Sequence, residues 1–180
     1  MAISAAMVKE LRERTGLGMM DCRKALSEAG GDMDLAIEDL RKKSSLKAAK
    51  KAGRTAANGL LGVKSSEDGK RVALVEVNIE TDFAAKNEKF IAFVSKVAQT
   101  LFDSGDMDLV IQTLNAERET LVQEIGENMA IRRGALVESA SGGLSYYMHG
   151  DQRRGAIVKL ADKRDELGRD LSMHVVAINP

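Results

Sequence analysis

The residues best suited to act on a partner lie at Thr81–Ala84, where an acid and an aromatic stand side by side. Aromatic residues make up only 3% of the chain, so Phe83 stands out. An apolar strand pattern ends just before this stretch, and a helical pattern begins just after it. Two interpretations are open. In the first, Thr81 or Asp82 caps the helix through its side-chain oxygen and Phe83 packs locally; in the second, the Asp82–Phe83 pair projects outward toward a partner.

Other side chains capable of chemistry form no recognised catalytic or metal-binding pattern. Residues 59–65 resemble a phosphate-binding loop, but Val63 stands where the motif needs a glycine directly before Lys-Ser. His149 and His174 are far apart in sequence and have no cysteine nearby, which argues against a metal site. Cys22 lies among apolar neighbours on a predicted helix, where a buried inert thiol is more common than a catalytic one. We therefore expect a protein-binding module without a cofactor, rather than an enzyme.

Composition places the chain among globular proteins. Its 180 residues are 44% hydrophobic, enough for one or two modest cores. Twenty-seven basic and 27 acidic residues give zero net charge, so no overall field attracts nucleic acid or an anionic membrane. The single cysteine, the charged N-terminus and the lack of a run of roughly 18 apolar residues predict a cytoplasmic protein with no membrane span.

The first 53 residues read as helices alone. Apolar spacing predicts a helix ending near Thr15, a second helix, and a third that begins after the N-cap Asp32. Together they form a compact three-helix bundle. Met19 and Met20 lie beside two glycines and fit either a core or an adaptable contact surface. We expect one of the two in the core, because a small bundle needs its apolar side chains there.

A basic segment at residues 41–54 carries seven Lys and Arg residues and no acid. Such runs usually mark a solvated helix end or a linker, and we interpret this one as the boundary between two domains. Nucleic-acid binding is the alternative, although no aromatic residue interleaves the lysines to stack on a base.

The remainder of the chain predicts two copies of a β-hairpin followed by a helix. The elements of the first copy are strands at 59–64 and 71–77, a helix with an apolar stripe from Phe90 to Leu101, a helix at 114–128 and a strand at 131–139. The elements of the second copy are strands at 144–149 and 155–160 and a helix from about Glu166. We infer an internal duplication in an α+β protein, with domains at 1–53, 54–140 and 141–180, the last incomplete.

Three segments, VKELRERTGLGMMDCRKAL, VNIETDFAAKNEKF and IGENMAIRR, resemble the bacterial translation elongation factor Ts family, and the similarity covers residues 1–180. That family consists of guanine nucleotide exchange factors for the GTPase elongation factor Tu. The resemblance implies a ubiquitin-associated-like three-helix domain followed by two duplicated ββααβ-type core subdomains. Family members continue into a coiled coil and then complete the second subdomain, so we expect its hairpin to have an exposed edge here.

The resemblance also implies a role for the opening stretch. In the family, the Thr-Asp-Phe segment enters the nucleotide-binding domain of elongation factor Tu, and Mg²⁺ is lost from its site. Carried over, Phe83 is a wedge between two partner helices, Asp82 disturbs residues near the metal, and Thr81 and Ala84 complete the segment. Ala84 stands where the family commonly has valine. Further implied partner contacts are Met19, Met20, Ile125, Gly126 and His149.

Such a factor needs no catalytic residue of its own, because binding of the factor and binding of nucleotide weaken each other reciprocally. The expected partner is elongation factor Tu in its GDP-bound and nucleotide-free forms. Two rival functions remain open: an adaptor for ubiquitin-like domains built on residues 1–53, and an RNA-binding accessory protein built on residues 41–54.

Overall fold

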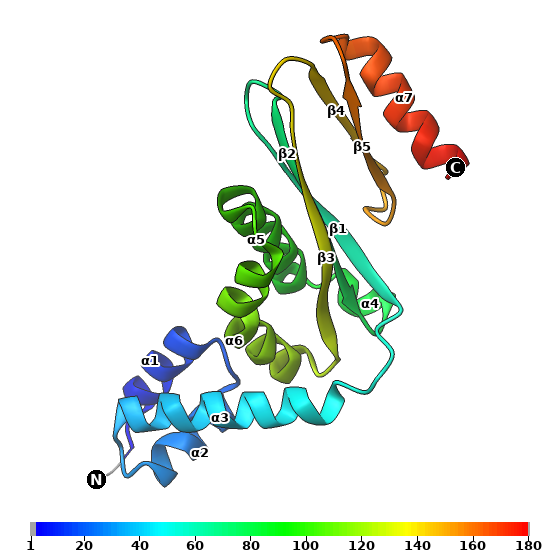
Figure 1. The fold of residues 1–180 in the computed structure, drawn as a ribbon. Helices are drawn as coiled ribbons and strands as arrows, with labels where there is room; N and C mark the ends of the chain where they lie inside the picture. The colour runs from blue at the N-terminus through cyan, green and yellow to red at the C-terminus, as the bar shows by residue number, and fades with distance from the viewer. Residues whose placement is uncertain (1–2, 180) are drawn as a thin grey trace. The chain divides into compact units, whose positions relative to one another are not determined.

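The computed structural model describes residues 3–179, which form two compact units. The first unit contains the N-terminal helices up to Thr55 together with Asn115–Asn128, and the second contains Ala56–Leu114 and the chain from Met129 onward. Over the described residues the structure has seven helices and two antiparallel sheets (Figure 1), which confirms the α+β class. No helix in this part of the chain is long and apolar enough to cross a membrane.

Three helices open the first unit, as predicted: α1 (Ala5–Thr15), α2 (Met19–Glu28) and α3 (Met33–Lys51). Asp32 is the N-cap of α3, since its Oδ1 accepts a hydrogen bond from the Leu35 amide at 2.9 Å. Leu11, Cys22, Leu26 and Leu40 are fully buried and form the centre of the bundle core. Burial of the Cys22 thiol agrees with the sequence interpretation.

The placement of Met19 and Met20 corrects one expectation, because both side chains are exposed and neither joins the core. Leu17, in the connection before α2, is buried instead. Inward positions on α2 are then taken by Cys22, Ala25 and Leu26, which leaves the first turn of this helix facing outward.

Residues 41–51 of the basic segment form the second half of α3, and residues 52–54 follow the helix, so the segment is a helix end, one of the two forms expected for it. Several of its cations have partners within the first unit: Lys42 pairs with Glu38 at 2.8 Å, Lys43 pairs with Glu28, and the Lys51 ammonium donates to the Gly126 carbonyl.

A three-stranded antiparallel sheet forms the frame of the second unit, in the order β1 (Asn58–Ser65), β2 (Arg71–Ile79), β3 (Met129–Glu138). Helix α5 (Glu88–Ser104) covers one face of this sheet (Figure 1) and buries the predicted stripe from Phe90 to Leu101. A Cβ on Gly62 would lie 2.9 Å from the Val94 side chain, so the glycine permits this close packing.

Helix α6 (Met107–Ile125) begins well before Leu114, where the sequence pattern placed its start. The reason is a cap: Asp106 Oδ1 accepts hydrogen bonds from the amides of Asp108 at 2.8 Å and Leu109 at 3.2 Å. Val110 and Leu114 are buried, which gives the added turns an apolar face.

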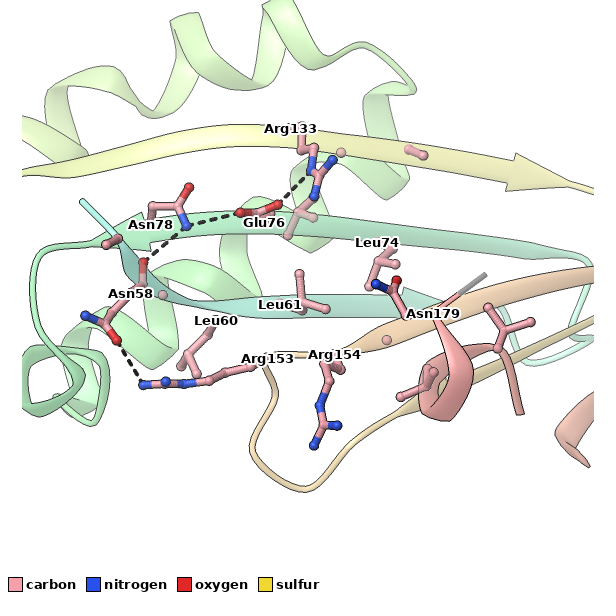
Figure 2. Close-up of a pocket in the computed structure, with 18 of the residues that line it drawn as sticks. Asn58, Leu60, Leu61, Leu74, Glu76, Asn78, Arg133, Arg153, Arg154 and Asn179 are labelled. Atoms are coloured by element: carbon pink, nitrogen blue, oxygen red, sulfur yellow. Dashed lines mark hydrogen bonds and ion pairs between the residues drawn. The ribbon is translucent and has the colours of Figure 1, made fainter. Parts of the chain in front are cut away.

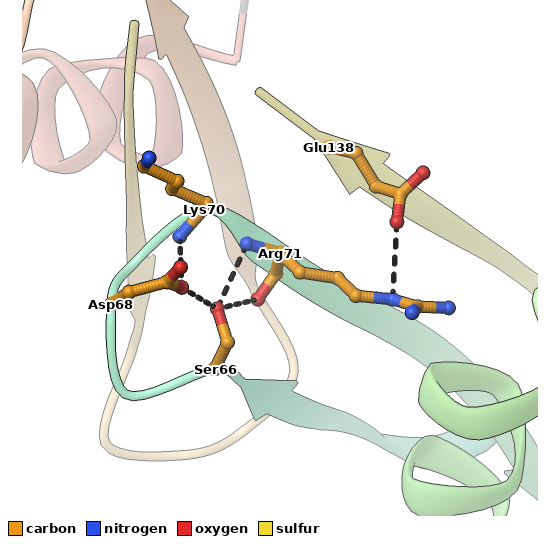
Figure 3. Close-up of polar contacts among 5 residues, drawn as sticks. All are labelled: Ser66, Asp68, Lys70, Arg71 and Glu138. Atoms are coloured by element: carbon orange, nitrogen blue, oxygen red, sulfur yellow. Dashed lines mark hydrogen bonds and ion pairs between the residues drawn. The ribbon is translucent and has the colours of Figure 1, made fainter. Parts of the chain in front are cut away.

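The turn between β1 and β2 is held by side chains (Figure 3). Ser66 Oγ donates to Asp68 Oδ1 at 2.6 Å, and that carboxylate also accepts from the Lys70 amide at 3.0 Å. These two hydrogen bonds lower the pKa of Asp68. At the start of β2, Arg71 forms an ion pair with Glu138 of β3. The predicted hairpin is therefore confirmed, with its turn fixed locally.

The second hairpin pairs β4 (Gly143–Met148) with β5 (Gly155–Leu160), and α7 (Asp165–Ile178) packs on both strands (Figure 1). The order strand, strand, helix repeats that of β1, β2 and α5, as the inferred duplication requires. Residues 59–65, the near match to a phosphate loop, lie entirely within β1.

Candidate functional site

The Thr81–Ala84 stretch forms the start of α4 (Asp82–Ala85), a single helical turn between β2 and α5. Thr81 is its N-cap: Oγ1 accepts a hydrogen bond from the Ala84 amide at 3.2 Å. Asn87 caps α5 in turn, by accepting from the Lys89 amide at 2.9 Å. Asp82 is the first helical residue, so of the two capping candidates the structure selects Thr81 and leaves the Asp82 carboxylate available for other contacts.

Phe83 does not pack locally, contrary to the first sequence interpretation. Its side chain is 81% exposed, more than any other large hydrophobic residue in the described part of the chain. Ala84 and Ala85, the next two residues, are buried and anchor the turn on the hairpin. The Phe83 ring therefore points outward from a short helical turn. Thr81 caps the start of this turn, and Asn87 caps the helix that follows it.

Lys86 contacts both members of the acid–aromatic pair. Its Nζ lies 3.7 Å from Asp82 Oδ2 and 5.7 Å from the centroid of the Phe83 ring. The spacing of four residues from Asp82 and three from Phe83 lets Lys86 reach each of these side chains. Exposed contacts of these kinds are each worth about 1 kcal/mol or less, so they bias the two side chains without immobilising them.

A polar network joins the start of β1 to the end of β2, directly before the α4 turn (Figure 2). Asn58 Nδ2 donates to the Glu80 carbonyl at 2.9 Å. Asn78 Nδ2 donates to the Asn58 carbonyl and to Glu76 Oε1, each at 3.1 Å. Glu76 also accepts from Arg133 of β3 at 2.6 Å. Asn58, Glu76, Asn78 and Arg133 line part of a cleft of about 650 Å³ in the second unit.

The environment of Glu76 shifts its pKa in two directions. Partial burial raises the pKa, but hydrogen bonds from Arg133 and Asn78 and the charges of Arg133 and Arg132 outweigh burial, so the net pKa is lowered. A carboxyl with a depressed folded-state pKa stabilises the fold above its ordinary pKa, and this stabilisation is lost as the pH falls through the folded-state value.

We expect Glu76→Gln to reduce the loss of stability that occurs as the pH is lowered. Between about pH 7 and about pH 3, the melting temperature of the unmodified chain should fall further than that of the variant, because only the carboxylate gains a proton on unfolding there. Glu67→Gln, in the exposed β1–β2 turn, is the matched control. Parallel profiles for Glu76→Gln and the unmodified chain would contradict the assignment.

His149 lies in the turn after β4. Its Nδ1 is 3.2 Å from the Tyr147 hydroxyl, and its amide donates to the Arg154 carbonyl at 2.9 Å. Arg153 of the same turn donates through Nη2 to Asn58 Oδ1 at 3.2 Å (Figure 2), and the Leu61 amide donates to the Gln152 carbonyl at 2.7 Å. Hydrogen bonds thus join the turn that contains His149 to β1, and Asn58 at the start of β1 is hydrogen-bonded to Glu80, directly before Thr81–Ala84.

The other four candidate residues belong to the first unit. Met19 and Met20 are 57% and 76% exposed at the start of α2, which has no side-chain cap. Ile125 ends α6, and Gly126 follows with φ of 88°, a conformation suited to glycine. No group of three or more His, Cys, Asp or Glu side chains within residues 3–179 is arranged to hold a metal ion.

Three residues near the site were missed from the sequence: Lys86, Asn58 and Arg153. Helical spacing from Asp82 and Phe83 would have indicated Lys86. No local pattern connects Asn58 with Arg153, because they lie on different hairpins and meet only in the folded unit.

The comparisons with known proteins agree on one family. The family model described as "Elongation factor TS" matches residues 80–180. Elongation factor Ts from Saccharophagus degradans is 51% identical over 183 aligned residues, covering 100% of this chain and 63% of that protein. The proteins of the same name from Marinobacter nauticus and Arthrospira platensis are 52% and 49% identical, with 99% of this chain covered in each case and 62% and 75% of those proteins. The chain spans about 63% of the length of the first curated relatives it matches. It belongs to the elongation factor Ts family.

Proposed function

We propose that this chain is a translation elongation factor that binds GDP-bound elongation factor Tu and promotes release of the nucleotide. The observation that carries the proposal is the exposed Phe83 beside Asp82 on the capped turn after β2. A protein gains nothing in its own stability from an aromatic ring left in water, so such a ring is a candidate for burial in a partner.

In this mechanism Phe83 inserts as a wedge into the nucleotide-binding domain of the partner, and Asp82 disturbs groups near Mg²⁺. Burial of one large apolar side chain supplies roughly 1.5–3 kcal/mol. Mg²⁺ demands near-ideal octahedral geometry, so a small displacement of its ligands weakens the hold on the phosphates. Because coupling between two binding sites is reciprocal, GDP and the factor weaken each other's binding. The chain acts by binding and catalyses no covalent step.

Further contacts in the proposal come from Met19 and Met20, with Ile125, Gly126 and His149 as additional points. Exposed methionines make adaptable apolar contacts, which suits a surface that meets another protein. We assign residues 1–53 to a ubiquitin-associated-like domain and residues 54–140 and 141–180 to two core subdomains. The place of action would be the cytoplasm, where the partner and the ribosome are found.

RNA binding through residues 41–54 is the weaker candidate. Lys42 and Lys43 form ion pairs with Glu38 and Glu28, and the Lys51 ammonium donates to the Gly126 carbonyl, so these three side chains already have partners within the chain. RNA affinity that falls steeply with salt would favour this candidate.

The direct test is release of labelled GDP from elongation factor Tu. We expect substoichiometric amounts of this chain to accelerate release, since an exchange factor dissociates and acts again. The comparison is spontaneous release under the same Mg²⁺ concentration, and excess Mg²⁺ should reduce the acceleration. Equal rates with and without the chain would refute the proposal.

A further inference from the structure

Two segments that we propose as partner contacts, Thr81–Ala84 and the turn with His149, are tied to one side chain. Asn58 donates through Nδ2 to the Glu80 carbonyl, directly before the Thr81 cap, at 2.9 Å. Its Oδ1 accepts from Arg153 Nη2, in the His149 turn, at 3.2 Å (Figure 2). One amide therefore uses its donor toward one segment and its acceptor toward the other.

The Asn58 side chain and its partners are themselves held in place. Asn58 is half-buried at the start of β1, where it pairs with Ile79, and its carbonyl accepts from Asn78 Nδ2. On the other side, the Gln152 carbonyl accepts from the Leu61 amide, and Asp151 Oδ1 accepts from the Arg153 amide at 3.0 Å. Arg153 therefore lies in a turn that is already hydrogen-bonded to β1, and from this turn its guanidinium contacts Asn58.

We propose that Asn58 and Arg153 are positioning residues that join the two segments into one preformed partner-binding surface. The inference rests on the proposed function and extends it to residues that do not themselves touch the partner. Prior alignment of two loops lowers the entropy that binding must otherwise remove, so a break in the link weakens the productive complex. The Asn58 amide serves both ends because it carries a donor and an acceptor, whereas a carboxylate cannot donate to the Glu80 carbonyl.

Arg153→Gln tests the link at the exposed end, where folding is not at risk. We expect chain-stimulated GDP release to slow by about three- to tenfold, the factor that corresponds to the usual net free energy of one hydrogen bond. In a His149→Ala background the same change should slow exchange no further, because the turn then has no contact left to position. Arg169→Gln, an exposed arginine on α7, is the control for loss of charge and should leave the rate unchanged.

Asn58→Asp tests the other end of the link. This variant keeps an acceptor for Arg153, but it places a second acceptor opposite the Glu80 carbonyl. GDP release should therefore slow when Asn58→Asp is the only change, and should change little when Asn58→Asp is added to Phe83→Ala. Amide hydrogen exchange of the chain alone supplies a readout without the partner. Residues 149–154 should exchange faster in Arg153→Gln, and residues 81–87 faster in Asn58→Asp.

The possible outcomes separate this inference from the proposed function. If the unmodified chain fails to accelerate GDP release, the proposed function fails, and the hydrogen-exchange result alone decides whether the link positions the segments. If Arg153→Gln leaves both measurements unchanged, the inference is wrong. An effect of Arg153→Gln that persists at full size in His149→Ala would show a direct partner contact and would also overturn it.

Discussion

Phe83→Ala should slow chain-stimulated GDP release from elongation factor Tu by about tenfold or more, while the melting temperature of the chain stays the same. The rate falls because the wedge loses roughly 1.5–3 kcal/mol of apolar burial in the partner, and 1.4 kcal/mol corresponds to a factor of ten. Stability is spared because the ring is 81% exposed and packs against no core. Stopped-flow release of fluorescent GDP, alongside circular dichroism melting, measures both quantities.

Two companion variants make this test specific. Phe83→Leu keeps an apolar wedge and should retain an intermediate rate. Asp82→Ala should also slow release and leave the turn folded, because the N-cap is Thr81 and not Asp82. If Phe83→Ala lowered the melting temperature and exchange merely followed the folded fraction, the ring would be a structural residue and the wedge mechanism would be wrong.

Phe90→Ala should do the opposite and destabilise the fold by about 3–5 kcal/mol, the usual cost of removing a buried phenylalanine side chain. Phe90 is fully buried in the first turn of α5, against the sheet of the second unit. The cost has two parts: the variant buries less apolar surface on folding, and a cavity remains where the ring was. Urea unfolding followed by circular dichroism gives the change in free energy.

Phe83→Ala is the natural control for Phe90→Ala, since the same atoms are removed seven positions earlier. Ile91→Ala, on the partly exposed side of α5, should cost less than Phe90→Ala. At temperatures where Phe90→Ala remains folded, its exchange activity should be close to normal. A Phe90→Ala protein with unchanged unfolding free energy would contradict the burial of Phe90 against the sheet.

Local sequence patterns determined most of the secondary structure. The stripe from Phe90 to Leu101 predicted α5, and the strand patterns at 59–64 and 71–77 predicted the first hairpin, because both signals arise between near neighbours in the chain. The strand–strand–helix repeat was likewise visible in order and spacing alone. One local signal was overlooked: Asp106 caps α6, so the helix starts at Met107.

Tertiary structure alone decided which side chains of the candidate site are buried, capped or joined. Met19, Met20 and Leu17 are all apolar neighbours in sequence, and only the packing of the bundle buries Leu17 and exposes the two methionines. The choice of Thr81 over Asp82 as the cap depends on backbone geometry at the end of β2. The Arg153–Asn58 contact joins residues on two separate hairpins. Contacts of that kind depend on how strands pair and pack, and a local sequence window carries no signal for them.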